Sequence, residues 1–174
     1  MKYIRLFEDF QLGDLNFMSP EEIKELFFEE CRKDNPDLEL IRVIVENGLM
    51  DVGAKDKWGH TPLHMAKNIE LAKLLITSGA DVDAKNEYSS TPLHWAVYGN
   101  NIAIAKLLIT SGADVNAKGE YGSTPLHWAV SRDNIEIAKL LIDSGAKVNS
   151  KNGYDNTPLD LAKSQEMRDL LMGN

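Results

Sequence analysis

The chain has 174 residues, of which 43% are hydrophobic and 26% charged, an ordinary composition for a folded globular chain. The formal net charge is −8, and residues 1–50 hold 12 acidic against 6 basic side chains, so most of the acidity lies in the N-terminal part. This balance argues against a nucleic-acid partner, which needs a basic face, and leaves room for a protein partner with a basic surface.

Cysteine content and hydropathy bear on the compartment. Cys31 is the only cysteine, so no disulfide forms within the chain, and we expect a cytoplasmic, intracellular location. No apolar run approaches the ~18 residues needed to cross a bilayer. The first ten residues also lack the unbroken apolar centre of a secretory signal. We therefore expect no membrane association.

Residues 1–18 form an N-terminal segment outside the pattern of the remaining chain. Four apolar residues in it fall at helical spacing and would form one stripe: Tyr3, Ile4, Phe7 and Phe10. We favour packing of this segment against the end of the following domain. Docking of a second partner and disorder stay open as alternatives.

A first helix is predicted from Pro20 to about Arg32, because Ser19 and Glu22 can form a capping box and proline suits the first helical position. A second helix is predicted over residues 38–47, with Asp37 as its N-cap. This pair of helices is the first of several.

The remaining chain repeats two phrases. The first phrase reads TPLHMA from Thr61, TPLHWA from Thr91, TPLHWA from Thr124 and TPLDLA from Thr157, at intervals of 30, 33 and 33 residues. The second reads IELAKLLITSGADVD from Ile69, IAIAKLLITSGADVN from Ile102 and IEIAKLLIDSGAKVN from Ile135. A period of about 33 residues with TPLHxA resembles the ankyrin repeat, in which a β-turn is followed by two helices.

The resemblance implies an all-α repeat solenoid, an ankyrin-type stack of five helix pairs with β-turn or hairpin tips. We place an ankyrin repeat domain at residues 19–174, with repeats at about 19–53, 54–83, 84–116, 117–149 and 150–174. The first pair lacks TPLH and is a divergent N-terminal cap. The last is a shortened C-terminal cap. The second and fifth repeats lack three residues after their first helix, which we expect to narrow the groove floor there.

The histidines carry no pattern of a catalytic or metal site. The resemblance implies that His64, His94 and His127 hold the turns by hydrogen bonds to backbone or threonine. Stacked repeats lie ~10 Å apart, too far for shared coordination at ~2 Å. No phosphate-binding glycine loop, catalytic carboxylate pair or C-x-x-C motif occurs. We therefore expect no enzyme activity, cofactor or metal, and an enzyme or metal-binding protein is the remote alternative.

Aromatic residues recur at one register of the predicted turns. In proteins that the chain resembles, this turn lies beside a concave groove and contacts partners, and such rings give a large contact area with a polar end. The alternative is that each ring packs on the next turn and stiffens the array, as Trp95 and Trp128 are expected to pack in the core. The expected partner-binding residues are Trp58, Tyr88, Tyr98, Tyr121, Arg132 and Tyr154, with the variable turn residues Lys57, Glu87 and Glu120.

The predicted function is a monomeric, non-catalytic protein–protein interaction module. One version is an inhibitor or immunity-type protein that occludes an enzyme or toxin, and another is a scaffold. An adaptor whose residues 1–18 dock a second partner is the alternative. Repeat scaffolds host many unrelated roles, so the sequence does not name the partner.

Overall fold

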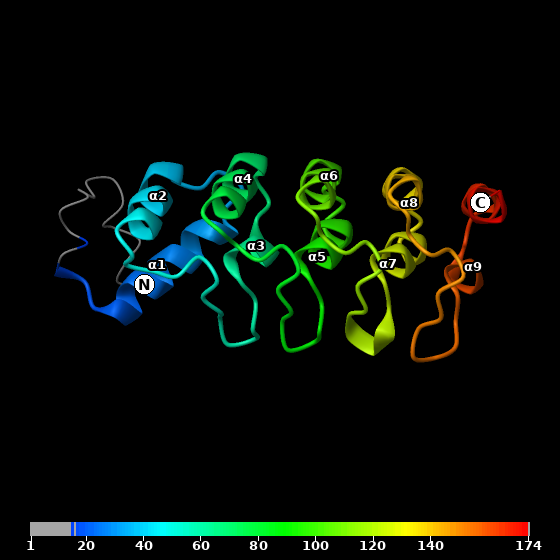
Figure 1. Ribbon diagram of the computed structural model, residues 1–174, viewed down its shortest axis with the longest axis horizontal. Helices are drawn as coiled ribbons and strands as arrows, with labels where there is room; N and C mark the ends of the chain where they lie inside the picture. The colour runs from blue at the N-terminus through cyan, green and yellow to red at the C-terminus, as the bar shows by residue number, and fades with distance from the viewer. Residues whose placement is uncertain (1–14, 16, 174) are drawn as a thin grey trace.

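The computed structural model describes Leu15 and residues 17–173, which form a row of helix pairs (Figure 1). The expectations placed on Tyr3, Ile4, Phe7 and Phe10 lie outside the described residues. The inner row consists of α1 (Pro20–Arg32), α3 (Pro62–Met65), α5 (Pro92–Tyr98), α7 (Pro125–Ser131) and α9 (Pro158–Leu161). The outer row consists of α2 (Leu38–Glu46), α4 (Ile69–Thr77), α6 (Ile102–Thr110), α8 (Ile135–Asp143) and α10 (Gln165–Met172).

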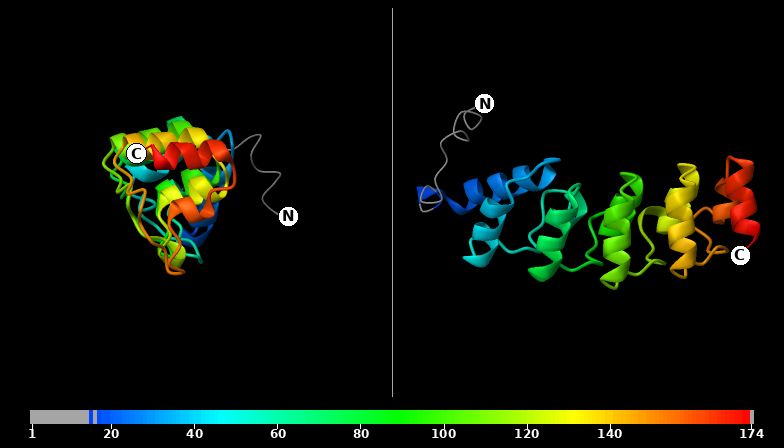
Figure 2. Two further views of the ribbon diagram at one scale, coloured as in Figure 1. Left: turned by 90° about the vertical axis from the view of Figure 1, so that its right-hand side faces the viewer. Right: turned by 90° about the horizontal axis from the view of Figure 1, so that it is seen from above.

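The two rows run side by side along the whole array. Each inner helix contacts the next inner helix, and each outer helix contacts the next outer one. Viewed along the row, successive pairs lie behind one another, and the turns project together from one side (Figure 2, left). The predicted all-α repeat solenoid of five helix pairs is confirmed, and we call the side formed by the inner helices and the turns the concave face.

The core is a strip of apolar side chains between the two rows. The leucine of the TPLH phrase is buried in three repeats, at Leu63, Leu93 and Leu126. The outer helices face it with residues such as Leu71, Leu75, Ile104, Leu108, Ile137 and Leu141, which are all buried. Neither helix of a pair hides its apolar stripe alone, so burial depends on stacking between neighbours.

The first pair begins and ends close to the predicted positions. The Ser19 hydroxyl accepts the Glu22 N–H at 3.3 Å, and the Glu22 carboxylate accepts the Ser19 N–H at 2.8 Å, which completes the capping box. Asp37 caps α2 by accepting the Leu40 N–H at 3.0 Å. The second helix ends at Glu46, one residue before the predicted end.

Each TPLH histidine ties its own repeat to the next turn. In the third pair, His94 is fully buried, and its Nδ1 accepts the Thr91 N–H at 3.2 Å. Because Nδ1 must accept, the ring proton lies on Nε2, which donates to the Ser123 carbonyl at 3.1 Å. His64 and His127 make the matching bonds, to the carbonyls of Ser90 and Asn156. The predicted turn-holding role of the histidines is confirmed.

The fifth pair keeps only half of this arrangement. Asp160 accepts both the N–H and the hydroxyl of Thr157 at 2.7 Å, so the capping box survives. A carboxylate has no donor that could reach a following turn. The substitution therefore preserves the start of α9 and removes the link to a neighbour.

The third turn differs from the other three because of Gly119. At the matching position Asp56, Asn86 and Asn152 accept two backbone N–H groups of their own turns. Gly119 has no side chain to do so. The turn η2 (Glu120–Gly122) instead places Tyr121 at a φ of 52°, in the left-handed region.

Replacing Gly119 with alanine is expected to destabilise the fold by about 2 kcal/mol, because overpacking a filled site forces its neighbours to move. A Cβ there would lie 2.9 Å from His94 Nε2 and 3.1 Å from the Ser90 hydroxyl, both buried. Gly53→Ala is the control, since its Cβ would meet only the Asp51 carboxylate at 3.4 Å. Urea unfolding of both variants checks this, and equal stability would contradict it.

Candidate functional site

The inner helices differ in length, and this shapes the concave face. The first has 13 residues and α5 has 7, whereas α3 between them has 4. A hollow of about 680 Å³ lies at α3, between the ends of α1 and α5, and we call it the α3 hollow. The expectation of a narrowed groove floor is wrong here, because the missing residues leave space rather than drawing the neighbouring helices together.

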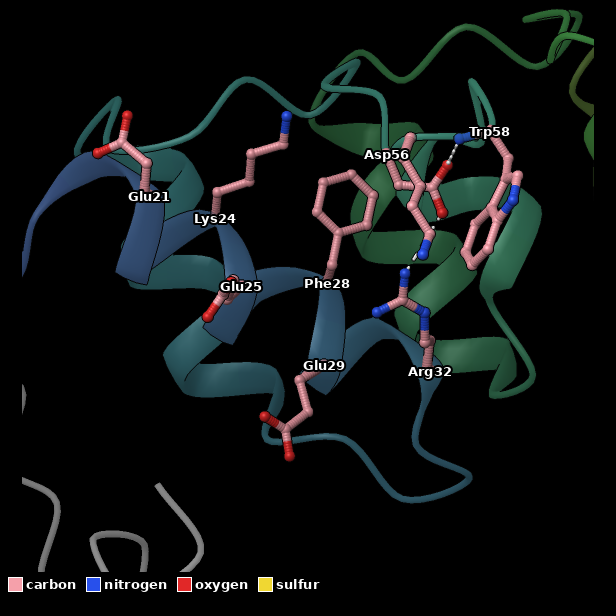
Figure 3. Close-up of a pocket in the computed structure, with 9 residues that line it drawn as sticks. Glu21, Lys24, Glu25, Phe28, Glu29, Arg32, Asp56 and Trp58 are labelled. Carbon is pink, nitrogen blue, oxygen red and sulfur yellow. Dashed lines mark hydrogen bonds and ion pairs between the residues drawn. The ribbon is translucent and has the colours of Figure 1, made fainter. Parts of the chain in front are cut away.

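A second hollow adjoins the first on the side of α1. This α1 hollow has a volume of about 720 Å³ and lies between α1 and the first turn (Figure 3). Its walls carry the ring of Phe28 and the ring of Trp58. Both hollows share Arg32, Asp56 and Trp58, so together they form one depression in the N-terminal half of the concave face.

An ionic group separates the two hollows. The Arg32 guanidinium lies 3.3 Å from the Asp56 carboxylate, which also accepts a contact from His60 Nδ1 at 3.4 Å. Burial opposes ionisation of Asp56, but hydrogen bonds from the N–H groups of Trp58 and His60 outweigh it and lower the pKa of this carboxyl group. Asp56 therefore stays ionised and fixes both the turn and the arginine.

Aromatic rings line the α3 hollow and continue along the inner row. Successive ring centroids lie 6.0 Å apart from Trp58 to His60, 4.7 Å from His60 to Trp95, and 6.0 Å from Trp95 to Tyr98. Tyr98 continues the series to Trp128 at 6.0 Å. Ring contacts at these separations are favourable and restrict the side chains to fixed orientations.

Two cations stack on exposed rings of this series. Lys57 Nζ lies 4.2 Å from the centroid of Trp58, and the Arg132 guanidinium lies 4.3 Å from that of Tyr98. Both distances suit a cation–π interaction. The rings remain 43% and 51% exposed, so they are held in place and still accessible.

The four turn-tip rings are all exposed, but only one pair touches. Tyr121 and Tyr154 have centroids 5.5 Å apart, while no ring contact joins Trp58, Tyr88 and Tyr121 within residues 17–173. The negative charge of Glu120 raises the pKa of the Tyr121 phenol. Among the turn-tip rings of the described residues, ring-to-ring packing therefore joins only Tyr121 and Tyr154.

The family follows from the repeats. A family model of ankyrin repeats matches the chain three times, at residues 30–119, 67–152 and 117–173. The chain belongs to the ankyrin repeat family. Ankyrin repeats generally mediate protein–protein interactions and are typically non-catalytic. A search of curated proteins gives no match for this ankyrin repeat chain.

Two further findings concern the described part of this ankyrin repeat chain. None of its helices combines the length and apolar character needed to cross a bilayer. Nor do three or more His, Cys, Asp or Glu side chains gather there in a group that could hold a metal ion. The TPLH histidines use both ring nitrogens in hydrogen bonds, which leaves no lone pair for a ligand.

The expected site residues divide into two groups on the ankyrin repeats. Trp58, Lys57 and Tyr98 lie at the hollows, with Arg132 stacked on Tyr98. The other group follows the turns toward the C-terminus and consists of Tyr88, Glu87, Glu120, Tyr121 and Tyr154.

Sequence reasoning missed several residues of the hollows. Trp95 was assigned to the core, but it is only partly buried and lines the α3 hollow with Met65. Phe28 and the glutamates of α1 were assigned to a cap. The sequence signal for the hollows was the absence of three residues after Ala66. It indicated that the groove changes at this repeat, but not whether the groove becomes narrower or wider.

Proposed function

We propose that this ankyrin repeat protein binds a protein partner through its concave face and turn tips, without catalysis. The observation that carries the proposal is a set of five aromatic side chains that are 43% to 64% exposed: Trp58, Tyr88, Tyr98, Tyr121 and Tyr154. Tyrosine and tryptophan are enriched among the residues that dominate binding energies at interfaces.

Rigidity of the display supports the same function. The TPLH histidines hold three turns, and the Glu87 N–H donates to the Trp58 carbonyl of the neighbouring turn at 3.1 Å. Gly153 donates to the Tyr121 carbonyl in the same way, at 2.6 Å. Contacts that are already ordered in the free protein lose little conformational entropy on binding, which raises affinity.

The role that fits best is an inhibitor, immunity-type or scaffold protein that covers its partner, in an intracellular setting and as a monomer. The N-terminal excess of 12 acidic over 6 basic residues in 1–50 supports a partner with a basic surface. The alternative is an adaptor that recruits a second partner through its first residues.

The test is a double variant, Tyr88→Ala with Tyr121→Ala, in a pull-down from the organism that encodes the chain. Partner affinity is expected to fall about tenfold or more, because two exposed rings are lost. The matched control, Tyr88→Phe with Tyr121→Phe, keeps both rings and should retain binding. Unchanged recovery with the alanine variant would show that these rings are structural.

The same pull-down separates the adaptor alternative. Deleting residues 1–14 leaves the buried Leu15 in place, and circular dichroism checks that the shortened chain folds. Under the proposal, the main partner is retained. Loss of one partner while another stays bound would favour the adaptor.

A further inference from the structure

Three glutamates form a row along the rim of the α1 hollow. Glu21, Glu25 and Glu29 lie at every fourth position of α1, are exposed, and line the hollow (Figure 3). In the part of the chain that the structure describes, none of the three takes part in an ion pair. At 1.5 Å per residue, the row extends about 12 Å along the helix.

Most cations beside the row are already engaged. Arg32 pairs with Asp56, and Lys57 lies on the face of Trp58. Lys24 is the remaining cation among the residues that line the α1 hollow. Three carboxylates therefore face solvent beside one ammonium group, and this rim attracts a positively charged surface.

The α3 hollow has a different character. Its rim charges compensate each other, since Lys67 lies 3.3 Å from Asp34 and Arg32 lies 3.3 Å from Asp56. Its walls include Met65 and the rings of Trp95 and Tyr98. A volume of about 680 Å³ beside these apolar residues has room for a large uncharged side chain.

We propose that the two hollows form one docking site for a basic segment of the protein partner. The segment inserts a large apolar or aromatic side chain into the α3 hollow and places lysine or arginine side chains against Glu21, Glu25 and Glu29. This inference rests on the proposed function and locates its energetic centre in the N-terminal half of the concave face. Burial of the apolar side chain supplies most of the affinity, and the glutamates supply orientation and association rate.

The probe is a displayed library of random peptides of about 16 residues, which can cover the glutamate row and reach the α3 hollow. Selected peptides are expected to carry net positive charge and at least one large apolar residue. Tyr98→Ala should weaken their binding about tenfold or more. The double variant Glu25→Lys with Glu29→Lys should weaken it about tenfold at low ionic strength and less at high salt.

Two variants serve as matched controls, with folding checked by circular dichroism. Met172→Ala removes an apolar side chain that is 62% exposed at the end of α10, outside both hollows, and Glu136→Lys reverses an exposed charge on α8. Each is expected to change peptide affinity less than about threefold, the range of most interface substitutions outside an energetic centre.

The outcomes separate this inference from the function on which it rests. Selected peptides that are acidic, or that lose as much affinity with Met172→Ala as with Tyr98→Ala, would overturn the docking site. A natural partner that binds the Tyr98→Ala and the Glu25→Lys with Glu29→Lys variants as tightly as the wild-type chain would also overturn the docking site. The proposed function would still stand in that case. Failure of the wild-type chain to bind any protein would overturn both.

Discussion

Replacing His94 with alanine is expected to lower the free energy of unfolding by about 3 kcal/mol, one of the largest losses available from a single substitution here. The ring is fully buried and joins the Thr91 N–H to the Ser123 carbonyl. Alanine leaves a cavity, removes a helix cap and leaves both backbone groups without their partner. The loss is therefore larger than that of one hydrogen bond.

Urea unfolding followed by circular dichroism measures this effect. Asp160→Ala is the matched control, because Asp160 occupies the same position in its repeat, is exposed, and binds Thr157 alone. Its loss should be about 1 kcal/mol, the usual value of an N-cap. Similar losses for the two variants would mean that the hydrogen bond from His94 to the Ser123 carbonyl of the next repeat contributes little to stability.

Acidification from pH 7 to pH 5 is expected to destabilise the fold by about 2 kcal/mol for each of His64 and His94. Burial lowers the pKa of both imidazoles to about 4 and also lowers the pKa of His127. The unfolded chain takes up these protons near the ordinary histidine pKa of about 6.5, whereas the folded chain does not. The stabilisation is therefore complete above pH 6.5 and is lost as pH falls toward 4.

Urea midpoints at pH 7, 6 and 5 test this expectation. The pKa values of Asp56 and Asp160 are lowered from their ordinary value of 3.8, so these two groups change the stability only at pH values below this range. In the His94→Ala chain, the loss of unfolding free energy between pH 7 and pH 5 should be smaller by the contribution of one histidine, about 2 kcal/mol. Stability that stays constant or rises between pH 7 and pH 5 would contradict buried neutral rings.

The fold was predictable because the repeats carry the same residues at the positions that set helix starts, helix ends and turns. Threonine and proline mark the start of the last four inner helices, and glycine follows the outer helices at Gly79, Gly112 and Gly145, where φ is 92° to 94°. The resemblance to ankyrin repeats implied that the TPLH histidines hold the turns, and the repeating register placed that role at His64, His94 and His127. Four near-identical copies made these assignments mutually consistent.

The hollows were not predictable, because they depend on differences between neighbours. The deletion after Ala66 is visible in the sequence, but its effect depends on how far α1 and α5 extend past α3. The assignment of Trp95 to the core failed for the same reason, since its exposure is set by the space that the short helix leaves. Likewise, Tyr121 is the one turn-tip ring of the described residues with a left-handed backbone, and its turn is the one that begins with glycine, at Gly119, instead of Asp or Asn.

The direction of the histidine bonds decides how such an array can change length. Each ring donates forward to the next turn, so an internal duplication of residues 84–116 would supply a donor and an acceptor in register at both new junctions. A unit joined after Asp160 would begin with a turn that receives no such bond. Adding repeats by duplication is therefore compatible with the middle of the row and disfavoured after the fifth pair, where Asp160 stands in place of the histidine.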